Sequence, residues 1–226
     1  MVTKMKLYSA WYCPFAQRAW MALLKNNISF DYIETDPYDK NPQWMAISKG
    51  AGQVPVLVDG DLTLTDSCQI LTYLDNKQLD KPGLANAEYW MDLANTQIIP
   101  YFYRFLTEQS ASAQQDAREH MLKGLALFSD GVSEAGPYFT GAEIGPIDLA
   151  FIPFAYRITL LHNFYRGFKL NSSDPALVKY HAWYQHMTAT DIFNNTSMVT
   201  QDYASKMIDF YQIYSEGGGQ TDVTDL

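Results

Sequence analysis

The chain has few cysteines and few positive charges. Two cysteines in 226 residues, Cys13 and Cys68, cannot build the disulfide framework of a secreted protein. Lys and Arg number 16 against 25 Asp and Glu, which gives a formal net charge of −9. This acidic balance argues against a nucleic acid or an anionic membrane as a partner.

The sequence also lacks a long, unbroken apolar segment. Its longest apolar stretch, residues 144–156, contains Asp148 and two prolines, so it is too short and too broken to span a bilayer. No apolar run follows the first positive charges, as it does in a secretory signal peptide. We therefore expect a cytoplasmic protein that keeps its thiols reduced.

Metal-ligand spacing is missing as well. The chain has four histidines, and His181 and His186 are five residues apart and miss a shared helical face. Hydrophobic residues make up 47% of the chain and charged residues 18%, which is typical of a globular protein with a substantial core. The length fits one large domain or two small ones, and we expect no metal.

The first third of the chain alternates strand and helix patterns. A helix is predicted from Pro14 to about Asn26, and a second one begins at Asp66-Ser67. Asp59-Gly60 is a hairpin signal. Strands are expected at residues 5–8, 30–34, 54–58 and 62–64. This order predicts an α/β unit with a mixed four-stranded sheet over residues 1–77.

Strand patterns largely disappear in the remainder. Residues 78–86 are polar, contain Pro82-Gly83 and suit a linker. The pattern over residues 87–216 predicts an all-α domain. The Gly-rich acidic tail, residues 217–226, is expected to be disordered. Helices are expected at residues 87–106, 113–128, 146–161, 175–187 and 203–214.

Cys13 stands where a strand ends and a helix begins. Unpaired N–H groups and a partial positive charge at a helix N-terminus stabilise a thiolate, so we expect a pKa below the free value of about 8.5. Ala16 occupies the third position after Cys13, so the dithiol C-x-x-C is absent and a second substrate must supply the resolving thiol. Arg18, about one turn in, adds positive potential or forms a structural ion pair. Taken alone, a lone cysteine is more often a small buried hydrophobic residue.

Two further features each have an ordinary and a functional explanation. Val54-Pro55 opens an apolar strand, which fits an edge position or a cis bond that leaves the Val54 backbone free to pair with a peptide-like ligand. Asp66-Ser67 is a plain helix N-cap or a site for an amino-acid-like group. In the second case Ser67 and the helix N-terminus hold a carboxylate and Asp66 holds an ammonium.

Together these features resemble the cytosolic glutathione transferases over roughly residues 5–215. The resemblance is closest to the cysteine-type classes, omega and plant lambda, with the dehydroascorbate reductases nearby. It is carried by Cys13–Arg18 (CPFAQR), Gln53–Leu57 (QVPVL), Asp66–Leu74 (DSCQILTYL), Tyr138–Gly141, Ile147–Ala150, Pro153-Phe154 and Arg157. It implies a thioredoxin-like N-terminal domain followed by an all-α C-terminal domain.

The resemblance implies glutathione as co-substrate and assigns roles by position. Cys13 matches the residue that forms a mixed disulfide with glutathione. Val54 matches the residue whose backbone pairs with the cysteinyl part, and Pro55 matches the cis-proline. Asp66 and Ser67 match the γ-glutamyl site. The remaining candidates for the glutathione site are Phe15, Lys40 and Gln53, the last two for the glycyl carboxylate.

An acceptor pocket is expected between Cys13 and the helical half. Its candidates are Phe15, Tyr101, Arg104, Arg157, Tyr203 and Phe210, and for each aromatic residue core packing explains the pattern equally well. Arg157 resembles an arginine of omega-type acceptor sites. The chain departs from the family pattern in two places: Gly145 replaces Ser or Thr before the capping residue Asp148, and Asp66 replaces Glu.

Three functions remain open on the sequence. The first is a thiol transferase or reductase that uses Cys13 for deglutathionylation and dehydroascorbate reduction, with a small hydrophobic or disulfide acceptor. The second is a conjugating transferase or isomerase, in which a hydroxyl of Tyr8, Ser9 or Tyr12 activates glutathione. The third is a non-catalytic glutathione or ligand binder. Omega relatives tend to be dimers, whereas lambda relatives and dehydroascorbate reductases tend to be monomers, so the sequence leaves a monomer and a homodimer open.

Overall fold

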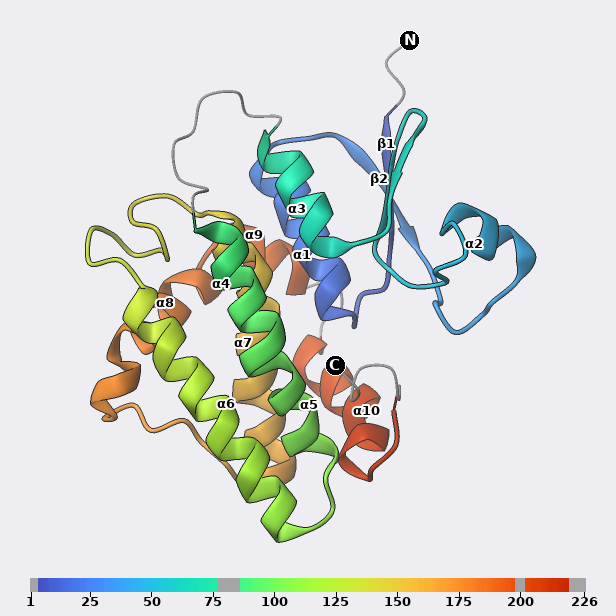
Figure 1. Ribbon diagram of the computed structural model, residues 1–226. Coiled ribbons are helices and arrows are strands. Elements are labelled where there is room, and N and C mark those ends of the chain that lie inside the picture. The colour runs from blue at the N-terminus through green and yellow to red at the C-terminus, as the bar shows by residue number, and fades with distance from the viewer. Residues whose placement is uncertain (1–3, 77–85, 198–201, 220–226) are drawn as a thin grey trace. The chain divides into compact units, whose positions relative to one another are not determined.

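The computed structural model describes residues 4–76, 86–197 and 202–219 (Figure 1). The chain divides into two compact units. One comprises residues 1–82 and 191–199, and the other comprises residues 83–190 and 200–226. The expected linker, 78–86, lies outside the described residues except for Asn86, and so does the end of the tail from residue 220.

The first unit is built on a four-stranded mixed sheet. Its strands are β1 (Met5–Ser9), β2 (Phe30–Glu34), β3 (Val56–Asp59) and β4 (Leu62–Leu64), in the order β2-β1-β3-β4. β1 pairs parallel to β2 and antiparallel to β3, and β3 and β4 form a hairpin. This confirms the predicted mixed sheet. The hairpin turn comprises Gly60 and Asp61, one residue later than expected, and Gly60 takes a positive φ of 61°.

Four helices complete this unit: α1 (Pro14–Lys25), α2 (Pro42–Ile47), α3 (Ser67–Asn76) and α9 (Asp191–Ser197). Figure 1 shows α1 and α3 side by side next to the sheet, with α2 on the other side of the strands. Ala16, Ala19 and Leu23 of α1 are fully buried, as their helical spacing predicts. They pack the helix into the core of the unit and fix the position of its first turn.

Residues 191–197 were assigned to the helical half without a predicted helix, yet they form α9 and belong to the first unit. This helix lies against α1, and the Gln17 side-chain amide donates a 3.1 Å hydrogen bond to the Thr196 hydroxyl. Both side chains are buried. A hydrogen bond between buried polar groups is costly to leave unmade, so this pair helps to hold α9 against α1.

The second unit is helical, as predicted, and differs most from the expectation in its first helix. A single helix was expected over 87–106, but a π-helical turn interrupts it, and Pro100 follows. Pro100 has no N–H to donate to the carbonyl four residues earlier, which disfavours a regular α-helix there. The elements are α4 (Ala87–Leu93), η1 (Ala94–Ile98), α5 (Ile99–Thr107), α6 (Ala111–Gly131), α7 (Pro146–Arg166), η2 (Pro175–Leu177), α8 (Val178–Thr188) and α10 (Tyr203–Ser215).

Asp148, in the first turn of α7, anchors the core of the helical unit. It is fully buried, and its carboxylate accepts hydrogen bonds from three donors: the backbone N–H of Phe139 at 2.8 Å, the backbone N–H of Gly145 at 2.7 Å and the Trp183 indole at 2.6 Å. The bond from Gly145 is the half of a capping box that the sequence retains, which confirms the predicted capping role. Charge-assisted bonds of this kind offset the cost of burying the carboxylate.

Arg166, in the last turn of α7, joins the ends of two other helices. Its guanidinium donates to the carbonyls of Phe105 at 3.1 Å and of Leu106, at the end of α5, and to the carbonyl of Ser215 at 2.9 Å, at the end of α10. These carbonyls lie in the last turns, where no helical N–H is left to pair with them. One side chain therefore caps two helices of the unit.

The beginning of the tail is ordered by α10. The N–H of Gly217 donates to the carbonyl of Tyr214 at 3.1 Å, and the N–H of Gly218 donates to that of Ile213 at 2.8 Å. Gly217 has a φ of +88°, which a glycine tolerates after a helix end. The expectation of disorder from residue 217 is therefore wrong for residues 217–219. Within the ranges that the structure describes, no helix is long and apolar enough to cross a membrane.

Candidate active site

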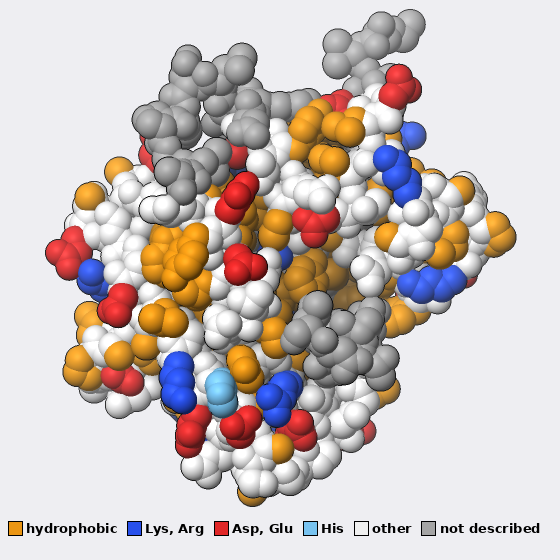
Figure 2. Space-filling view, viewed as in Figure 1, with side chains coloured by type: hydrophobic (Ala, Val, Ile, Leu, Met, Phe, Trp, Pro, Cys, Tyr) orange, Lys and Arg blue, Asp and Glu red, His pale blue; other side chains and the backbone are white. Residues whose placement is uncertain are grey.

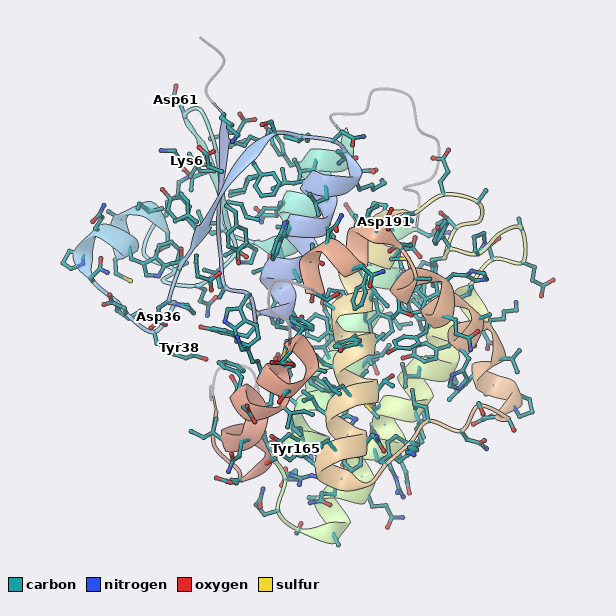
Figure 3. The ribbon with its side chains drawn as sticks, turned by 180° about the vertical axis from the view of Figure 1, so that it is seen from behind. Lys6, Asp36, Tyr38, Asp61, Tyr165 and Asp191 are labelled. Carbon is teal, nitrogen blue, oxygen red and sulfur yellow. The ribbon has the colours of Figure 1, made fainter. Side chains whose placement is uncertain are left out.

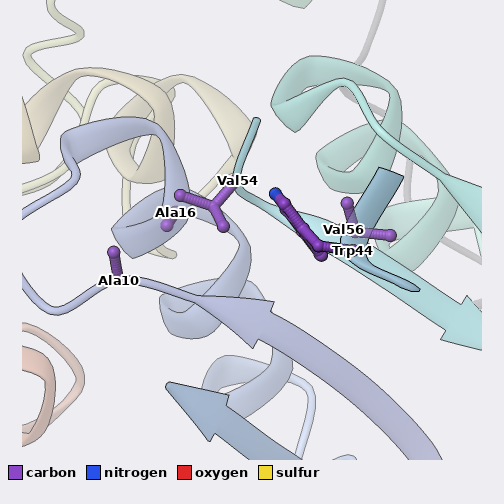
Figure 4. Packing of buried hydrophobic residues seen from close by; sticks show 5 residues of the cluster. All are labelled: Ala10, Ala16, Trp44, Val54 and Val56. Atoms are coloured by element: carbon purple, nitrogen blue, oxygen red, sulfur yellow. The ribbon is translucent and has the colours of Figure 1, made fainter. Parts of the chain in front are cut away.

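The sequence-predicted glutathione residues all belong to the first unit. They come from the turn between β1 and α1, the segment before β3 and the start of α3, with Phe15 in the first turn of α1 and Lys40 in the loop before α2. A buried apolar cluster supports the first two of these segments (Figure 4): Ala10, Ala16, Trp44, Val54 and Val56, with Tyr8, Tyr12, Cys13, Ile47 and Val58 packed against it. Cys13 and Val54 thus share one packed environment although 41 residues separate them.

Cys13 is the N-cap residue of α1. Its backbone is extended, with φ −80° and ψ 119°, and its carbonyl accepts the first helical bond from Gln17 at 3.0 Å. The side chain forms no capping bond, and the first turn of the helix contains no acidic residue. The partly exposed sulfur therefore lies at the positive end of the helix dipole, without a carboxylate in that turn to oppose it.

The segment before β3 contains the predicted cis peptide. Val54-Pro55 is cis, which confirms the prediction, and the Val54 carbonyl oxygen lies 3.8 Å from the Cys13 sulfur. Strand β3 begins at Val56, two residues later than expected, and its pairing with β1 begins at the same residue. The backbone of Val54 is therefore outside the sheet ladder and next to the thiol.

At the start of α3, Asp66 and Ser67 each accept a hydrogen bond from a different donor. Asp66 is exposed and accepts a 2.8 Å hydrogen bond from the N–H of Gln69, so the N-cap explanation is confirmed for one of its oxygens. Ser67 is 5% exposed, and its hydroxyl oxygen accepts a 3.1 Å hydrogen bond from Nη1 of Arg18. This second contact was not predicted, because it joins residues 49 positions apart.

Lys40 contacts the residue that precedes Gln53. The Lys40 ammonium donates to the carbonyl of Gly52 at 2.5 Å, directly before Gln53, and both side chains are exposed. Gly52 has a φ of +60° and donates its N–H to the buried Ser48 hydroxyl at 2.9 Å. A Cβ at Gly52 would come within 2.9 Å of the Lys40 nitrogen, so glycine permits this close approach.

Two tyrosines near the thiol, Tyr12 and Tyr32, are weaker acids than a free tyrosine. Burial, followed by the neighbouring Tyr38 and Asp36, raises the pKa of Tyr12 well above its usual range. Figure 3 shows Asp36 and Tyr38 in the segment that follows β2. Burial and a 2.6 Å hydrogen bond to Glu34 raise the pKa of Tyr32 in the same direction. Both phenols stay protonated at physiological pH.

Phe15, in α1, belongs to the first unit, and the other acceptor candidates fall into separate groups within the helical unit. Arg157 is fully buried; it donates to the carbonyl of Pro153 at 2.7 Å and to the Tyr203 hydroxyl at 3.4 Å. Arg157 and Tyr203 are therefore hydrogen-bonded to each other in the interior of the helical unit. The Phe210 ring packs with that of Tyr214, 6.2 Å away, an ordinary aromatic contact of the core.

Tyr101 and Arg104 form a different group, over α5 and α6. Tyr101 stacks on His120 with ring centroids 4.7 Å apart, and the Arg104 guanidinium lies 5.7 Å from the Tyr101 ring. Arg104 also pairs with Asp116 at 3.6 Å. Figure 2 shows this face, where a histidine lies among basic and acidic side chains. These two residues have partners of their own on the surface of the helical unit.

No metal site is apparent in the part of the chain that the structure describes. Residues 4–76, 86–197 and 202–219 contain no group of three or more His, Cys, Asp or Glu side chains placed to hold an ion. The chemical groups gathered in the first unit are instead a thiol, a backbone segment outside the ladder, a hydroxyl bonded to a guanidinium, and an ammonium. This set suits the binding of a small peptide with carboxylate groups and the reaction of its sulfur.

Comparison with known proteins agrees with this geometry. Residues 7–82 match the family described as glutathione S-transferase, N-terminal domain. Glutathione S-transferase U16 of Arabidopsis thaliana is 26% identical over 192 residues, which cover 78% of this chain and 82% of that protein. Glutathione S-transferase L2, chloroplastic, of the same plant is 26% identical over 211 residues, covering 89% of this chain and 68% of that protein.

A solved structure supports the fold of both units. The crystal structure of glutathione transferase Omega 3C from Trametes versicolor is similar with a TM-score of 0.77 and 26% identity. The similarity covers 93% of this chain and 91% of that one. The fold is therefore the thioredoxin-like N-terminal domain and helical C-terminal domain of glutathione transferases. The matches differ in their class designations, and together they support the glutathione S-transferase family for this chain.

Proposed function

We propose that the protein is a glutathione-dependent thiol transferase and reductase with Cys13 as its nucleophile. The observation that carries the proposal is the position of Cys13 as the N-cap of α1, with its sulfur 3.8 Å from the carbonyl of Val54. A thiol at a helix N-terminus is favoured as the thiolate, the form that attacks disulfides. The L2 and Omega 3C relatives bear the names of the classes that the sequence resembles most closely.

The reaction proceeds in two balanced exchanges. The Cys13 thiolate attacks the glutathione sulfur of a mixed disulfide, and a Cys13–glutathione disulfide forms while the acceptor leaves as a thiolate and takes up a proton. A second glutathione, deprotonated, attacks this new disulfide, releases oxidised glutathione and returns the Cys13 thiolate. Dehydroascorbate reduction is balanced in the same way. Two glutathione molecules are oxidised to one disulfide and supply the two electrons and two protons that convert dehydroascorbate to ascorbate.

The other candidate residues have supporting roles in this proposal. Val54 pairs through its backbone with the cysteinyl part of glutathione, next to cis-Pro55, while Asp66 and Ser67 hold the γ-glutamyl end. The Lys40 ammonium lies at the carbonyl of Gly52, the residue before Gln53, and these two exposed side chains suit the glycyl carboxylate. Phe15 lies beside the Arg18 guanidinium, with 5.0 Å between its ring centroid and Cζ.

The acceptor is proposed to be a small hydrophobic molecule or a disulfide. Arg157 and Tyr203, which hydrogen-bond to each other at 3.4 Å, are the pair we assign to its binding, with Tyr101, Arg104 and Phe210 as further candidates. The chain is proposed to act in the cytoplasm, as a monomer or a homodimer, and without a metal.

A conjugating transferase is the second candidate, because the U16 relative has a class designation different from those of L2 and Omega 3C. In that reaction a hydroxyl group stabilises the glutathione thiolate, which attacks an electrophile. Tyr12 is a poor choice for it, because burial raises its pKa and weakens it as a hydrogen-bond donor. Tyr8 and Ser9 remain the alternatives.

Paired assays separate the two functions. We expect reduction of 2-hydroxyethyl disulfide and dehydroascorbate to exceed conjugation of chlorodinitrobenzene. Cys13→Ser should abolish both reductions, because a serine hydroxyl stays protonated and cannot form the mixed disulfide, while glutathione binding is retained. Cys68→Ser, the matched control in the same unit, should change them little. Full reductase activity in Cys13→Ser, or loss of that activity in Cys68→Ser, would contradict the assignment of Cys13 as nucleophile and favour the hydroxyl-dependent conjugating transferase.

A further inference from the structure

Aromatic side chains surround the thiol within the first unit. Trp11 and Tyr12 directly precede Cys13, both are half-buried, and their rings meet edge to face with 5.6 Å between the centroids. Tyr38, in the loop between β2 and α2, is 49% exposed. Burial, followed by Tyr38, Asp36 and Cys13, raises the pKa of Tyr12. Interactions between charges act over a short range in salt solution, so these groups lie around one hydroxyl next to the thiol.

Two exposed carboxylates complete this surface, and hydrogen bonds hold both of them. Glu34, the last residue of β2, accepts from the backbone N–H of Trp11 at 3.2 Å and from the Tyr32 hydroxyl at 2.6 Å. Asp36 accepts from the backbone N–H of Tyr38 at 2.9 Å. We call the following five residues the aromatic rim: Trp11, Tyr12, Glu34, Asp36 and Tyr38. Because these bonds already order the rim, a ligand that binds there pays little for ordering it.

The composition of the aromatic rim fits a positively charged group. The face of an aromatic ring attracts an ammonium or guanidinium group, and a neighbouring carboxylate pairs with the same cation. Proteins carry such cations next to the cysteines that form disulfides with glutathione, because Lys or Arg beside a cysteine stabilises its thiolate and makes it prone to oxidation. The net charge of −9 on the chain also attracts a basic partner.

We propose that the aromatic rim binds a basic acceptor, namely a protein segment whose glutathionylated cysteine is flanked by Lys or Arg. The inference rests on the proposed function and names the class of disulfide that Cys13 reduces. The Cys13 thiolate attacks the glutathione sulfur, the disulfide bond of the substrate breaks, and the cysteine of the segment leaves as a thiolate and takes up a proton. Flanking cations speed this step, because they lower the pKa of the leaving thiol. Asp36 and Tyr38 contact the flanking side chains and no reacting atom, so they determine specificity.

Three synthetic peptides test the inference. Each has a glutathionylated cysteine between two Lys, two Gln or two Glu residues, and they are otherwise identical. The value of kcat/KM for release of the peptide thiol is measured at saturating glutathione for the unchanged protein, Asp36→Asn, Asp36→Lys and Tyr38→Leu. The quantity compared is the ratio of kcat/KM for the Lys peptide to that for the Gln peptide, because differences in the peptides' own reactivity cancel among variants.

This ratio should fall about threefold in Asp36→Asn and in Tyr38→Leu, as expected for the loss of one exposed charge pair or one cation–π contact. In Asp36→Lys it should fall about tenfold, and the Glu peptide should become the better substrate. About 0.5 M sodium chloride should reduce the preference of the unchanged protein for the Lys peptide. Asp36→Asn keeps an oxygen that accepts from the Tyr38 N–H, so it decides the matter if Asp36→Lys does not fold.

Asp61, exposed in the turn between β3 and β4, supplies the matched control. The strand register places it at the opposite end of the sheet from Asp36, as Figure 3 shows. Asp61→Lys changes the net charge as much as Asp36→Lys does, and it should lower the ratio by less than about twofold. Equal effects of the two variants, or a ratio that Asp36→Lys leaves within about twofold of the unchanged protein, overturn the inference.

The failure of this inference can be told apart from the failure of the proposed function. If the unchanged protein reduces neither 2-hydroxyethyl disulfide nor any of the peptides, the proposed function fails and the inference fails with it. If the unchanged protein reduces 2-hydroxyethyl disulfide and the rim variants do not change the preference among the peptides, the inference alone fails.

Discussion

The buried His162 should make the free energy of unfolding of the helical unit fall in acid, by an amount that its surroundings determine. The side chain is fully buried on α7, with its ring centroid 5.1 Å from that of Phe102 and 4.6 Å from that of Phe105. Nε2 lies 3.1 Å from the carbonyl oxygen of Phe102, so it carries the proton and donates. Among the described residues, Nδ1 has no hydrogen-bond partner.

This environment opposes a second proton on the ring. Desolvation by burial, assisted by the positive charge of Arg166 and opposed by the bond to Phe102, lowers the pKa of His162 to about 3. The folded protein therefore keeps the ring neutral, whereas the unfolded chain binds a proton below about pH 6.5. Stability from this group is fully present above pH 6.5 and falls as the pH drops from 6.5 toward 3.

The expected magnitude is about 1.4 kcal/mol of unfolding free energy per pH unit in that window. Two units below pH 6.5, at pH 4.5, His162 should cost about 2.7 kcal/mol relative to neutral pH. His162→Phe keeps an aromatic ring in the pocket and removes the titration. We therefore expect the variant to lose about that much less stability between pH 7.5 and pH 4.5 than the unchanged protein.

Urea unfolding followed by tryptophan fluorescence at several pH values measures this difference. Carboxylates titrate in both proteins, so their contribution cancels in the comparison. Phe154→Leu, a change at another fully buried ring of α7, controls for lost packing and should lower stability equally at every pH. Parallel pH curves for His162→Phe and the unchanged protein would refute the reasoning.

Two further predictions concern the start of α7. Asp148→Ala leaves three donors, among them the Trp183 indole, without their buried acceptor, and we expect it to lower the unfolding free energy by about 3–5 kcal/mol, measured by urea unfolding. Gly145→Ser should raise the melting temperature slightly, with a gain of about 0.3 kcal/mol, because a serine completes the capping box and glycine caps almost as well. A Cβ at Gly145 meets no atom closer than 3.5 Å, so a lower melting temperature would contradict this geometry.

The sequence predicted the parts of the site that local patterns determine. Pro14 and the helical spacing of Ala16 and Leu23 predicted the position of α1, and hence Cys13 at its N-terminus. The proline before an apolar strand allowed an edge position or a cis bond, and the family resemblance favoured the cis bond that Val54-Pro55 has. These features depend on the chemistry of a few neighbouring residues, which sequence analysis can evaluate.

Other parts depend on short elements or on distant residues. α2 has six residues, too few for a helical period to emerge, although Asn41 as its cap and Pro42 after it are typical signals of a helix start. The pairing of Arg18 with Ser67 and of Gln17 with Thr196 joins positions 49 and 179 residues apart. Nothing in the local sequence around either partner specifies such contacts, because they follow from the packing of whole helices.

The central claim is that Cys13 forms a mixed disulfide with glutathione. The most direct test incubates the reduced protein with oxidised glutathione, quenches the exchange with acid and locates the adduct by mass spectrometry of the intact chain and its peptides. The account predicts one glutathione on Cys13, released by added glutathione and absent from Cys13→Ser. An adduct confined to Cys68, or disulfide reduction that proceeds with Cys13 never modified, would contradict it.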